Sequence, residues 1–189
     1  VTGVQTCALP IWVGYAHGIF AVSCNGLTVS NCLFHTQGVT GSASGIYVRS
    51  SSRVKLLNNE VYGCNKGLNL NSCFSPDKTF ENGTLVRGNK VHDNPIDGVD
   101  IHGQYITIDQ NVIANNIDTE WKANHPDGIQ LIRSVVDGYT NVNHCRISRN
   151  VIYNHTQNIF VEGNQTAGDD GVVSDIHIFS NVEIGRAHV

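Results

Sequence analysis

The residues of this sequence with the greatest chemical capacity follow two Asp-Gly turns that lie thirty positions apart. Asp97–His102 reads DGVDIH and Asp127–Leu131 reads DGIQL. Carboxylates, an imidazole and an amide grouped in this way can transfer protons, or bind a hard cation such as Ca²⁺ through oxygen. Whether these side chains meet depends on the elements that carry them.

The two segments are copies of a unit that recurs along the chain. Weaker copies are Ser44–Arg49 (SGIYVR) and Lys66–Asn71 (KGLNLN). Apolar residues alternate with other residues in each copy, which is the pattern of a strand with one buried face. Two more short alternating runs follow each copy, so the unit holds three strands.

An asparagine separates the second and third strands of each unit. Its spacing varies from 22 residues (Asn89 to Asn111) to 39 residues (Asn111 to Asn150). We expect these residues to adopt the left-handed conformation of a tight corner and to hydrogen-bond to one another in a ladder. The full set is Asn31, Asn59, Asn89, Asn111, Asn150 and Asn181.

A three-stranded unit at this period predicts a stacked repeat fold. The chain resembles the right-handed parallel β-helix superfamily, which includes pectate lyases, over nearly all of Trp12 to Val182. We therefore expect an all-β fold, a single-stranded right-handed parallel β-helix of about six coils of three short strands. A leucine-rich repeat is disfavoured, because its Leu-x-x-Leu-x-Leu frame and its helical half are absent.

Both ends of the chain look foreign to the repeat. Residues 1–11 and 184–189 resemble translated sequencing adapters. We expect residues 12–183 to be an internal fragment of a longer β-helix from a metagenomic source, with truncated ends.

Composition argues against two classes of partner. The formal net charge is −4 and the sequence has no Lys/Arg stripe, which disfavours nucleic acid. No apolar run approaches the roughly 18 residues of a membrane helix.

The cysteines follow neither zinc-binding nor Cys-x-x-Cys spacing. We expect buried thiols, with a Cys24–Cys32 or a Cys64–Cys73 disulfide as open alternatives. Outside the tails, the cysteines are Cys24, Cys32, Cys64, Cys73 and Cys145.

Stacking the units in register aligns their outward residues in columns, with neighbouring strands about 4.8 Å apart. The resulting polar, solvent-facing surface suits an extended polymer. One column holds Tyr47, Asn69, Asp100, Gln130 and Phe160, the next holds Arg49, Asn71, His102, Ile132 and Glu162, and a third, at the preceding turn, holds Ser44, Lys66, Asp97, Asp127 and Gln157.

Four residues are the predicted catalytic group. Asp97 would lie over Asp127, so that either one of them holds a proton with a raised pKa or a Ca²⁺ ion lies between them. Asp100 would orient His102 as a base. The alternative is that each turn Asp bonds local backbone N–H groups and the strand residues are merely solvated. The predicted substrate-binding residues are Arg49, Asn69, Asn71, Gln130, Glu162 and the loop residues Trp121 and His125.

The resemblance implies a function in carbohydrate chemistry. We expect a polysaccharide partner and a lyase, epimerase or hydrolase acting on an acidic polysaccharide outside the cell or at its surface. The alternative is a non-catalytic glycan-binding or structural β-helix, such as an adhesin or a phage spike stalk. No reaction motif transfers, because the Asn-Thr-Asp and Arg-Ile-Lys motifs of polygalacturonases are absent, and His125-Pro126-Asp127 reverses the Asp-Pro-His motif of alginate epimerases.

Overall fold

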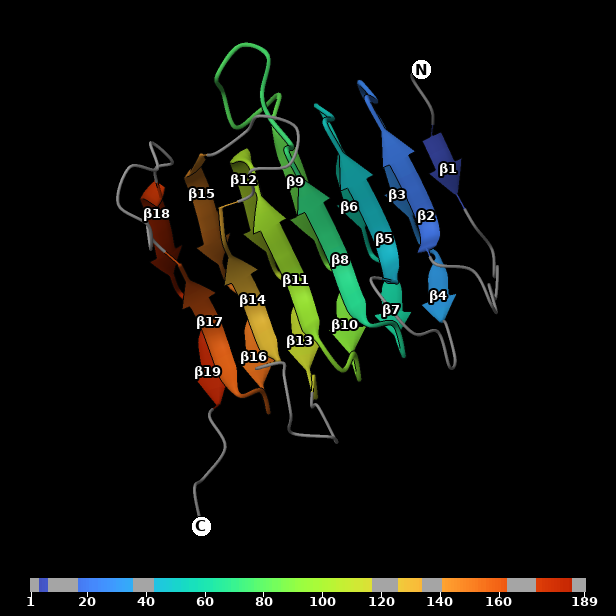
Figure 1. The fold of residues 1–189 in the computed structure, drawn as a ribbon, viewed down its shortest axis with the longest axis vertical. Helices are drawn as coiled ribbons and strands as arrows, with labels where there is room; N and C mark the ends of the chain where they lie inside the picture. The colour runs from blue at the N-terminus through green and yellow to red at the C-terminus, as the bar shows by residue number, and fades with distance from the viewer. Residues whose placement is uncertain are drawn as a thin grey trace.

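The computed structural model describes residues 4–6, 17–35, 43–116, 126–133, 141–162 and 173–184. Within these ranges the chain forms nineteen β-strands and no helix (Figure 1). This part of the chain therefore contains no helix that could cross a membrane.

The strands form three parallel sheets, numbered here by their order within a coil. Sheet 1 contains β2 (His17–Val22), β5 (Ser44–Arg49), β8 (Lys66–Asn71), β11 (Asp97–His102), β14 (Asp127–Leu131) and β17 (Gln157–Val161). Sheet 2 contains β1 (Val4–Thr6), β3 (Thr28–Ser30), β6 (Lys55–Leu57), β9 (Thr84–Arg87), β12 (Gln104–Asp109), β15 (Val142–Ser148) and β18 (Val173–Phe179). Sheet 3 contains β4 (Leu33–His35), β7 (Glu60–Tyr62), β10 (Lys90–His92), β13 (Val112–Ala114), β16 (Val151–Tyr153) and β19 (Val182–Ile184).

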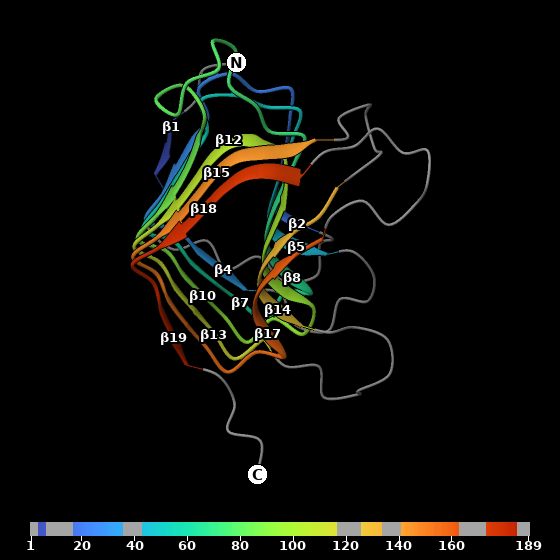
Figure 2. The same cartoon turned by 90° about the vertical axis from the view of Figure 1, so that its left-hand side faces the viewer.

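From β2 onward, each of the six coils contributes one strand to every sheet, and β1 adds a seventh strand to sheet 2. The three sheets surround a common interior (Figure 2). This confirms the predicted right-handed parallel β-helix of about six three-stranded coils. One described strand, β1, lies inside the segment 1–11 and pairs with β3. Its pairing does not bear on the origin of that segment, which stays a prediction.

Aliphatic side chains of successive coils stack to form the interior. In sheet 1, for example, Ile46, Leu68, Val99 and Ile129 are adjacent in register and fully buried. The five cysteines of the described chain are free thiols, and all except the half-buried Cys24 are buried, as expected. Burial raises the pKa of the Cys73 and Cys145 thiols to about 12, so these groups fill space rather than react.

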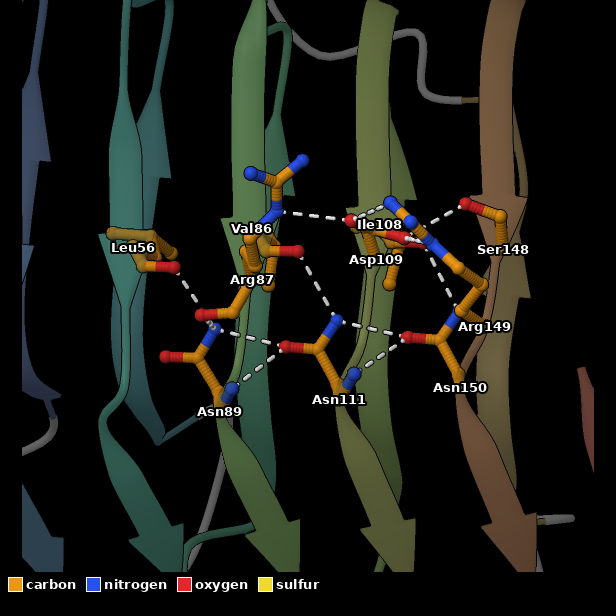
Figure 3. A network of polar contacts seen from close by, with 10 residues as sticks. All are labelled: Leu56, Val86, Arg87, Asn89, Ile108, Asp109, Asn111, Ser148, Arg149 and Asn150. Carbon is orange, nitrogen blue, oxygen red and sulfur yellow. Dashed lines mark hydrogen bonds and ion pairs between the residues drawn. The ribbon is translucent and has the colours of Figure 1, made fainter.

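A ladder of asparagine side chains runs through the corner between sheets 2 and 3, as predicted. The Asn111 side-chain amide donates to Asn150 Oδ1 (2.9 Å) and to the Val86 carbonyl (3.1 Å), while Asn111 Oδ1 accepts from the backbone and side chain of Asn89 (Figure 3). The same arrangement continues to Asn59 on one side and to Asn181 on the other.

Two details of the predicted ladder are wrong. The first rung is Cys32, whose backbone N–H bonds Asn59 Oδ1, and not Asn31. The residue with the left-handed backbone is also not the ladder residue itself but the residue directly before it. One residue turns the backbone at the corner, and the next one bonds to the neighbouring coil. These left-handed residues are Asn31, Asn58, Gly88, Gln110, Arg149 and Ser180.

A second ladder, which the sequence did not reveal to us, lies at the corner between sheets 3 and 1. Cys64 N–H donates to Asn94 Oδ1, Asn94 N–H to Asn116 Oδ1, and Asn116 N–H to His155 Nδ1. His155 Nε2 donates in turn to the carbonyl of Ile113. Burial lowers the pKa of His155, so this imidazole is a neutral structural rung.

We predict that Asn111→Ala lowers the free energy of unfolding by about 2–6 kcal/mol, because the buried Asn89 N–H and Val86 carbonyl lose partners worth roughly 1–3 kcal/mol each. The control is Asn181→Ala, at a half-buried rung where water can replace the lost bonds. Urea unfolding of both variants measures the difference. Equal losses would contradict the ladder's structural role.

Candidate functional site

Sheet 1 brings the predicted residues together in the expected columns. Asp97 is opposite Lys66 on one side and Asp127 on the other, and Asp100 lies between Asn69 and Gln130. His102 is in register with Asn71. The register that the repeats predict for the strands of this sheet is therefore correct for these residues.

An ion-pair group, here called the Lys66 cluster, occupies the centre of this sheet and consists of Lys66, Asp97, Asp100 and His102. Lys66 Nζ lies 3.3 Å from Asp97 Oδ2 and also contacts Asp100 Oδ2. One ammonium therefore bridges two carboxylates. His102 Nε2 completes the cluster at 2.9 Å from Asp100 Oδ1.

Gly98, between the two carboxylates of β11, packs closely against the next coil. Strict alternation would place Asp97 and Asp100, three residues apart, on opposite faces of β11. A Cβ atom at position 98 would lie only 2.5 Å from the backbone oxygen of Gly128, so the chain can approach the next coil this closely only with glycine there. Both carboxylates nevertheless contact the same ammonium.

The surface was expected to face solvent, and that expectation is wrong for its carboxylates. Asp100 and Asp127 are 0% exposed and Asp97 is 2% exposed, and Gln130 and Asn71 are buried too. The side chains point out of the apolar interior, but longer neighbours cover them. Lys66 and His102 lie against Asp100, and Gln130 Nε2 donates to Asp127 Oδ2 at 3.2 Å.

His102 does not have the geometry of the predicted base. Its Nδ1 lies 2.8 Å from the carbonyl of Ile132, and its Nε2 faces Asp100. The Nε2 contact is close but not aligned as a hydrogen bond. Both ring nitrogens are therefore engaged by the protein, and the imidazole acts as a polar cap over Asp100.

The two carboxylates of the cluster have pKa values displaced in opposite directions. Burial raises the pKa of Asp97, and the negative charge of Asp100 adds to this, while Lys66 offsets only part of the rise. Burial also acts to raise the pKa of Asp100, but His102 and Lys66 outweigh it and the net pKa is lowered.

Lys66 is held as an ammonium ion at neutral pH. Burial acts to lower its pKa, but the carboxylates of Asp100 and Asp97 outweigh burial and raise it. Its side chain is 22% exposed, more than those of its partners Asp97 (3%) and Asp100 (0%). Lys66 is therefore the member of the cluster that a large ligand reaches most readily.

The Asp97 and Asp127 pair does not fit a calcium ion. Asp97 Oδ1 accepts the backbone N–H of Asp127 (3.3 Å), and the Lys66 ammonium lies beside Asp97 Oδ2. Calcium requires six to eight oxygen ligands and would be repelled by this ammonium. Across the described ranges, no three His, Cys, Asp or Glu side chains are grouped to hold a metal. The other prediction for this pair was that one carboxyl group has a raised pKa. The pKa of Asp97 is raised, but burial and the charge of Asp100 raise it, not the charge of Asp127.

The predicted substrate-binding residues are only partly assembled. Arg49 and Asn71 are in register, and Asn71 Nδ2 donates to the Tyr47 hydroxyl at 3.3 Å. Glu162 directly follows β17, and its backbone N–H donates to the carbonyl of Leu131 at the end of β14. Strand β14 is the neighbour of β11, which carries Asp97, Asp100 and His102. Trp121 and His125 lie outside the described residues.

The predicted site residues leave out two parts of the site. Lys66 was placed in the correct column and, with Arg49, His102 and Arg133, is a side chain that the sequence offers as a lyase base, but it was not among the four predicted catalytic residues. An aromatic group of His17, Phe20 and Tyr47 was also missed, with ring centroids 5.1–5.4 Å apart. Extending the columns into the first coil would have placed Phe20 beside Tyr47.

We predict that Asp100→Asn destabilises the fold by about 3 kcal/mol at neutral pH, because it removes a buried charge that Lys66 and His102 compensate. The lowered pKa of Asp100 means that this stability is present above the unfolded value of about 3.9 and is lost as pH falls through the folded value. Denaturant unfolding of both proteins across acidic pH should show the difference shrinking as the pH falls below the unfolded value of about 3.9. A difference that does not change with pH would refute the ion-pair account.

Comparison with known proteins places this fold in a family. A family model described as the right handed beta helix region matches residues 13–134. A crystal structure of pectate lyase Pel9A is similar, with 15% sequence identity and a TM-score of 0.47 over 90% of this chain. The chain spans 47% of that protein's length. No curated protein gave a significant match. Because the family model covers well over half of the chain, the chain belongs to the right-handed β-helix family.

Proposed function

We propose that this chain binds an acidic polysaccharide along sheet 1 and that the Lys66 cluster removes the proton next to a uronate carboxyl group. The observation that carries the proposal is the single ammonium of Lys66 bridging Asp97 and Asp100. Perturbed, coupled titratable groups on one surface are typical of acid–base sites. The reaction class is that of a polysaccharide lyase or epimerase.

The opposite pKa shifts divide the acid–base work between the two carboxyl groups. Asp97, with its raised pKa, is the group better able to accept a proton from the Lys66 ammonium. Asp100, with its lowered pKa, remains a carboxylate that positions Lys66 and His102. Lys66 is an ammonium ion in the resting cluster, because its carboxylate partners raise its pKa. Proton abstraction therefore requires that Asp97, whose pKa burial raises, first takes one proton from Lys66 and leaves a neutral amine as the general base.

The proposed reaction is balanced without any further reactant. The Lys66 amine takes the proton from the carbon next to the uronate carboxyl, and the C–H electron pair moves to that carbon and its carboxyl group. In a lyase this pair then expels the neighbouring glycosidic oxygen, which takes up the proton held by Asp97, and leaves a double bond. In an epimerase the proton held by Asp97 is relayed through water to the opposite face of the same carbon.

The surroundings of the cluster suit an acidic sugar chain. Phe20, 56% exposed, stacks on Tyr47, and both lie in the same column as Asp100. Tyr47 is two strands from Asp100, about 10 Å at the usual strand spacing. Aromatic faces pack well against sugar rings, and the guanidinium of Arg49 in the adjacent column suits a uronate carboxylate. An extracellular or cell-surface location is part of this proposal, because that is where such polymers occur.

Two observations favour a second candidate function, a non-catalytic glycan-binding β-helix. Asp100 is completely buried, and both nitrogens of His102 face protein groups. A cluster satisfied in this way can serve structure alone. Hydrolysis by the carboxyl pair has less support than proton abstraction, because Lys66 lies over both carboxylates.

The decisive variant is Lys66→Arg, which keeps the positive charge but has too high a pKa to act as a base. We predict a loss of turnover of at least about 100-fold on polygalacturonate or alginate, since general-base catalysis contributes roughly 10²–10⁴-fold. Ultraviolet absorbance detects unsaturated product, and proton exchange in deuterium oxide detects epimerisation. The matched control is Lys90→Arg, on sheet 3 and paired with Glu60.

Full turnover by Lys66→Arg would overturn the role of Lys66 as a base. Binding of both polymers by the wild-type chain without turnover or exchange would favour the second candidate function. Circular dichroism of each variant separates loss of function from loss of fold.

A further inference from the structure

A groove with no part in the proposed reaction crosses the outer face of sheet 2. Its volume is about 540 Å³, within the range of small-ligand sites. This sheet 2 groove is lined by residues from β6, β9, β12, β15 and β18 and from the segment before β9. The residues that the argument uses are Lys55, Phe80, Arg87, Arg146, Arg149 and Phe179.

A buried carboxylate forms the floor of the groove and holds two arginines in place. Asp109 is 1% exposed and accepts from Arg149 Nε (2.8 Å), from Arg149 Nη2 (2.7 Å) and from Arg87 Nε (2.9 Å) (Figure 3). The Ser148 hydroxyl also donates to it at 2.9 Å. Burial acts to raise the pKa of Asp109, but Arg149, Ser148 and Arg87 outweigh burial and lower it.

This arrangement leaves donors on the two arginines for a ligand. The side chains of Arg87 and Arg149 are 46% and 54% exposed. Arg87 contacts Asp109 through Nε alone, and its two terminal nitrogens point away from that carboxylate (Figure 3). A guanidinium fixed in this way loses little freedom when its planar edge binds a carboxylate in two-point fashion.

The groove is locally positive in a negatively charged chain. Its lining includes four cations, Lys55, Arg87, Arg146 and Arg149, against Glu81 and Asp109. The formal charge of the lining is therefore +2, whereas that of the chain is −4. Because Asp109 is already engaged by Arg87 and Arg149, the charge offered to a ligand is positive. An anionic ligand fits this surface.

Aromatic rings flank the cations. The guanidinium carbon of Arg146 lies 3.7 Å from the centre of the Phe80 ring, and Phe80 packs edge-on against Tyr105. Phe179, 50% exposed, is in register with Ser148 beside the Asp109 floor. The groove therefore presents apolar ring faces together with fixed cations, which matches a sugar ring that carries a carboxylate.

The groove is also extended along the coil axis. Five stacked strands, β6 to β18, contribute to it, a length of about 19 Å at the usual strand spacing. A polymer crossing the strands would meet Lys55 and Arg87 in two adjacent coils and Arg146 and Arg149 two coils further on. Repeated carboxylates on one chain can satisfy such spaced cations.

We propose that the sheet 2 groove is a second binding site for an acidic polysaccharide, in which Arg87, Arg149, Lys55 and Arg146 hold uronate carboxylates and the Phe80 and Phe179 rings contact sugar faces. It belongs to a different sheet from the Lys66 cluster, so the two sites lie on different faces of one β-helix. The inference does not require turnover at Lys66.

The test is calorimetric titration of the chain with a hexamer of galacturonic acid. The test variant is the double substitution Lys55→Gln and Arg146→Gln, which spares the arginines that neutralise buried Asp109. Its control is Lys78→Gln with Lys90→Gln, which removes the same charge from exposed lysines outside the groove. We expect the test variant to weaken binding at least tenfold and the control to leave it unchanged.

Two further ligands and one further variant make the result specific. A neutral glucose hexamer should bind much more weakly than the uronate hexamer, and a single-stranded DNA hexamer should not compete with it. Unchanged binding by the test variant, equal binding of the neutral hexamer, or tighter binding of the DNA would each overturn the proposal. Lys66→Met, titrated alongside, should keep groove binding, so failure of the groove and failure of the proposed function are distinguishable.

Discussion

The side-chain amides of Asn59, Asn89, Asn111 and Asn150 are buried away from water, so their partners must come from within the protein, mainly from neighbouring coils. Asn111 shows the consequence, because its side chain bonds Asn150 and Val86 while receiving two bonds from Asn89. A slip of one residue at this corner would leave several buried polar groups without partners. The ladder therefore fixes the register of the coils, although the chain between rungs varies from 22 to 39 residues.

Register in turn determines the chemistry of the outer faces. It places Lys66 beside Asp97 on sheet 1 and Arg87 beside Asp109 on sheet 2. Both faces use the same device, a buried carboxylate whose charge is balanced by longer cationic side chains. On sheet 1 the result is one ammonium between two carboxylates with divergent pKa values. On sheet 2 two guanidiniums share one carboxylate and keep donors toward a groove.

The sequence was sufficient for the fold and for the columns of sheet 1, because both follow from alternation and from repeat spacing. It was insufficient for burial. Asp100 points away from the interior as predicted, yet the length and direction of Lys66 and His102, which alternation does not specify, cover it. The sheet 2 groove could not be predicted for the same reason, because alternation does not specify how far a side chain reaches. Asp109 and Arg149 are forty residues apart in sequence and meet only because the Arg149 side chain extends to the neighbouring coil. The second ladder was missed because Cys64 and His155 replace asparagine at its two ends.

The central claim is that Lys66 sits between two carboxyl groups of unequal acidity. Carbon-13 NMR titration of the aspartate carboxyl groups, with Asp97 and Asp100 assigned by substitution, measures this directly. The account predicts that Asp97 titrates above the ordinary aspartate pKa of about 3.9 and Asp100 below it. Titration of both groups together near the ordinary value would contradict it.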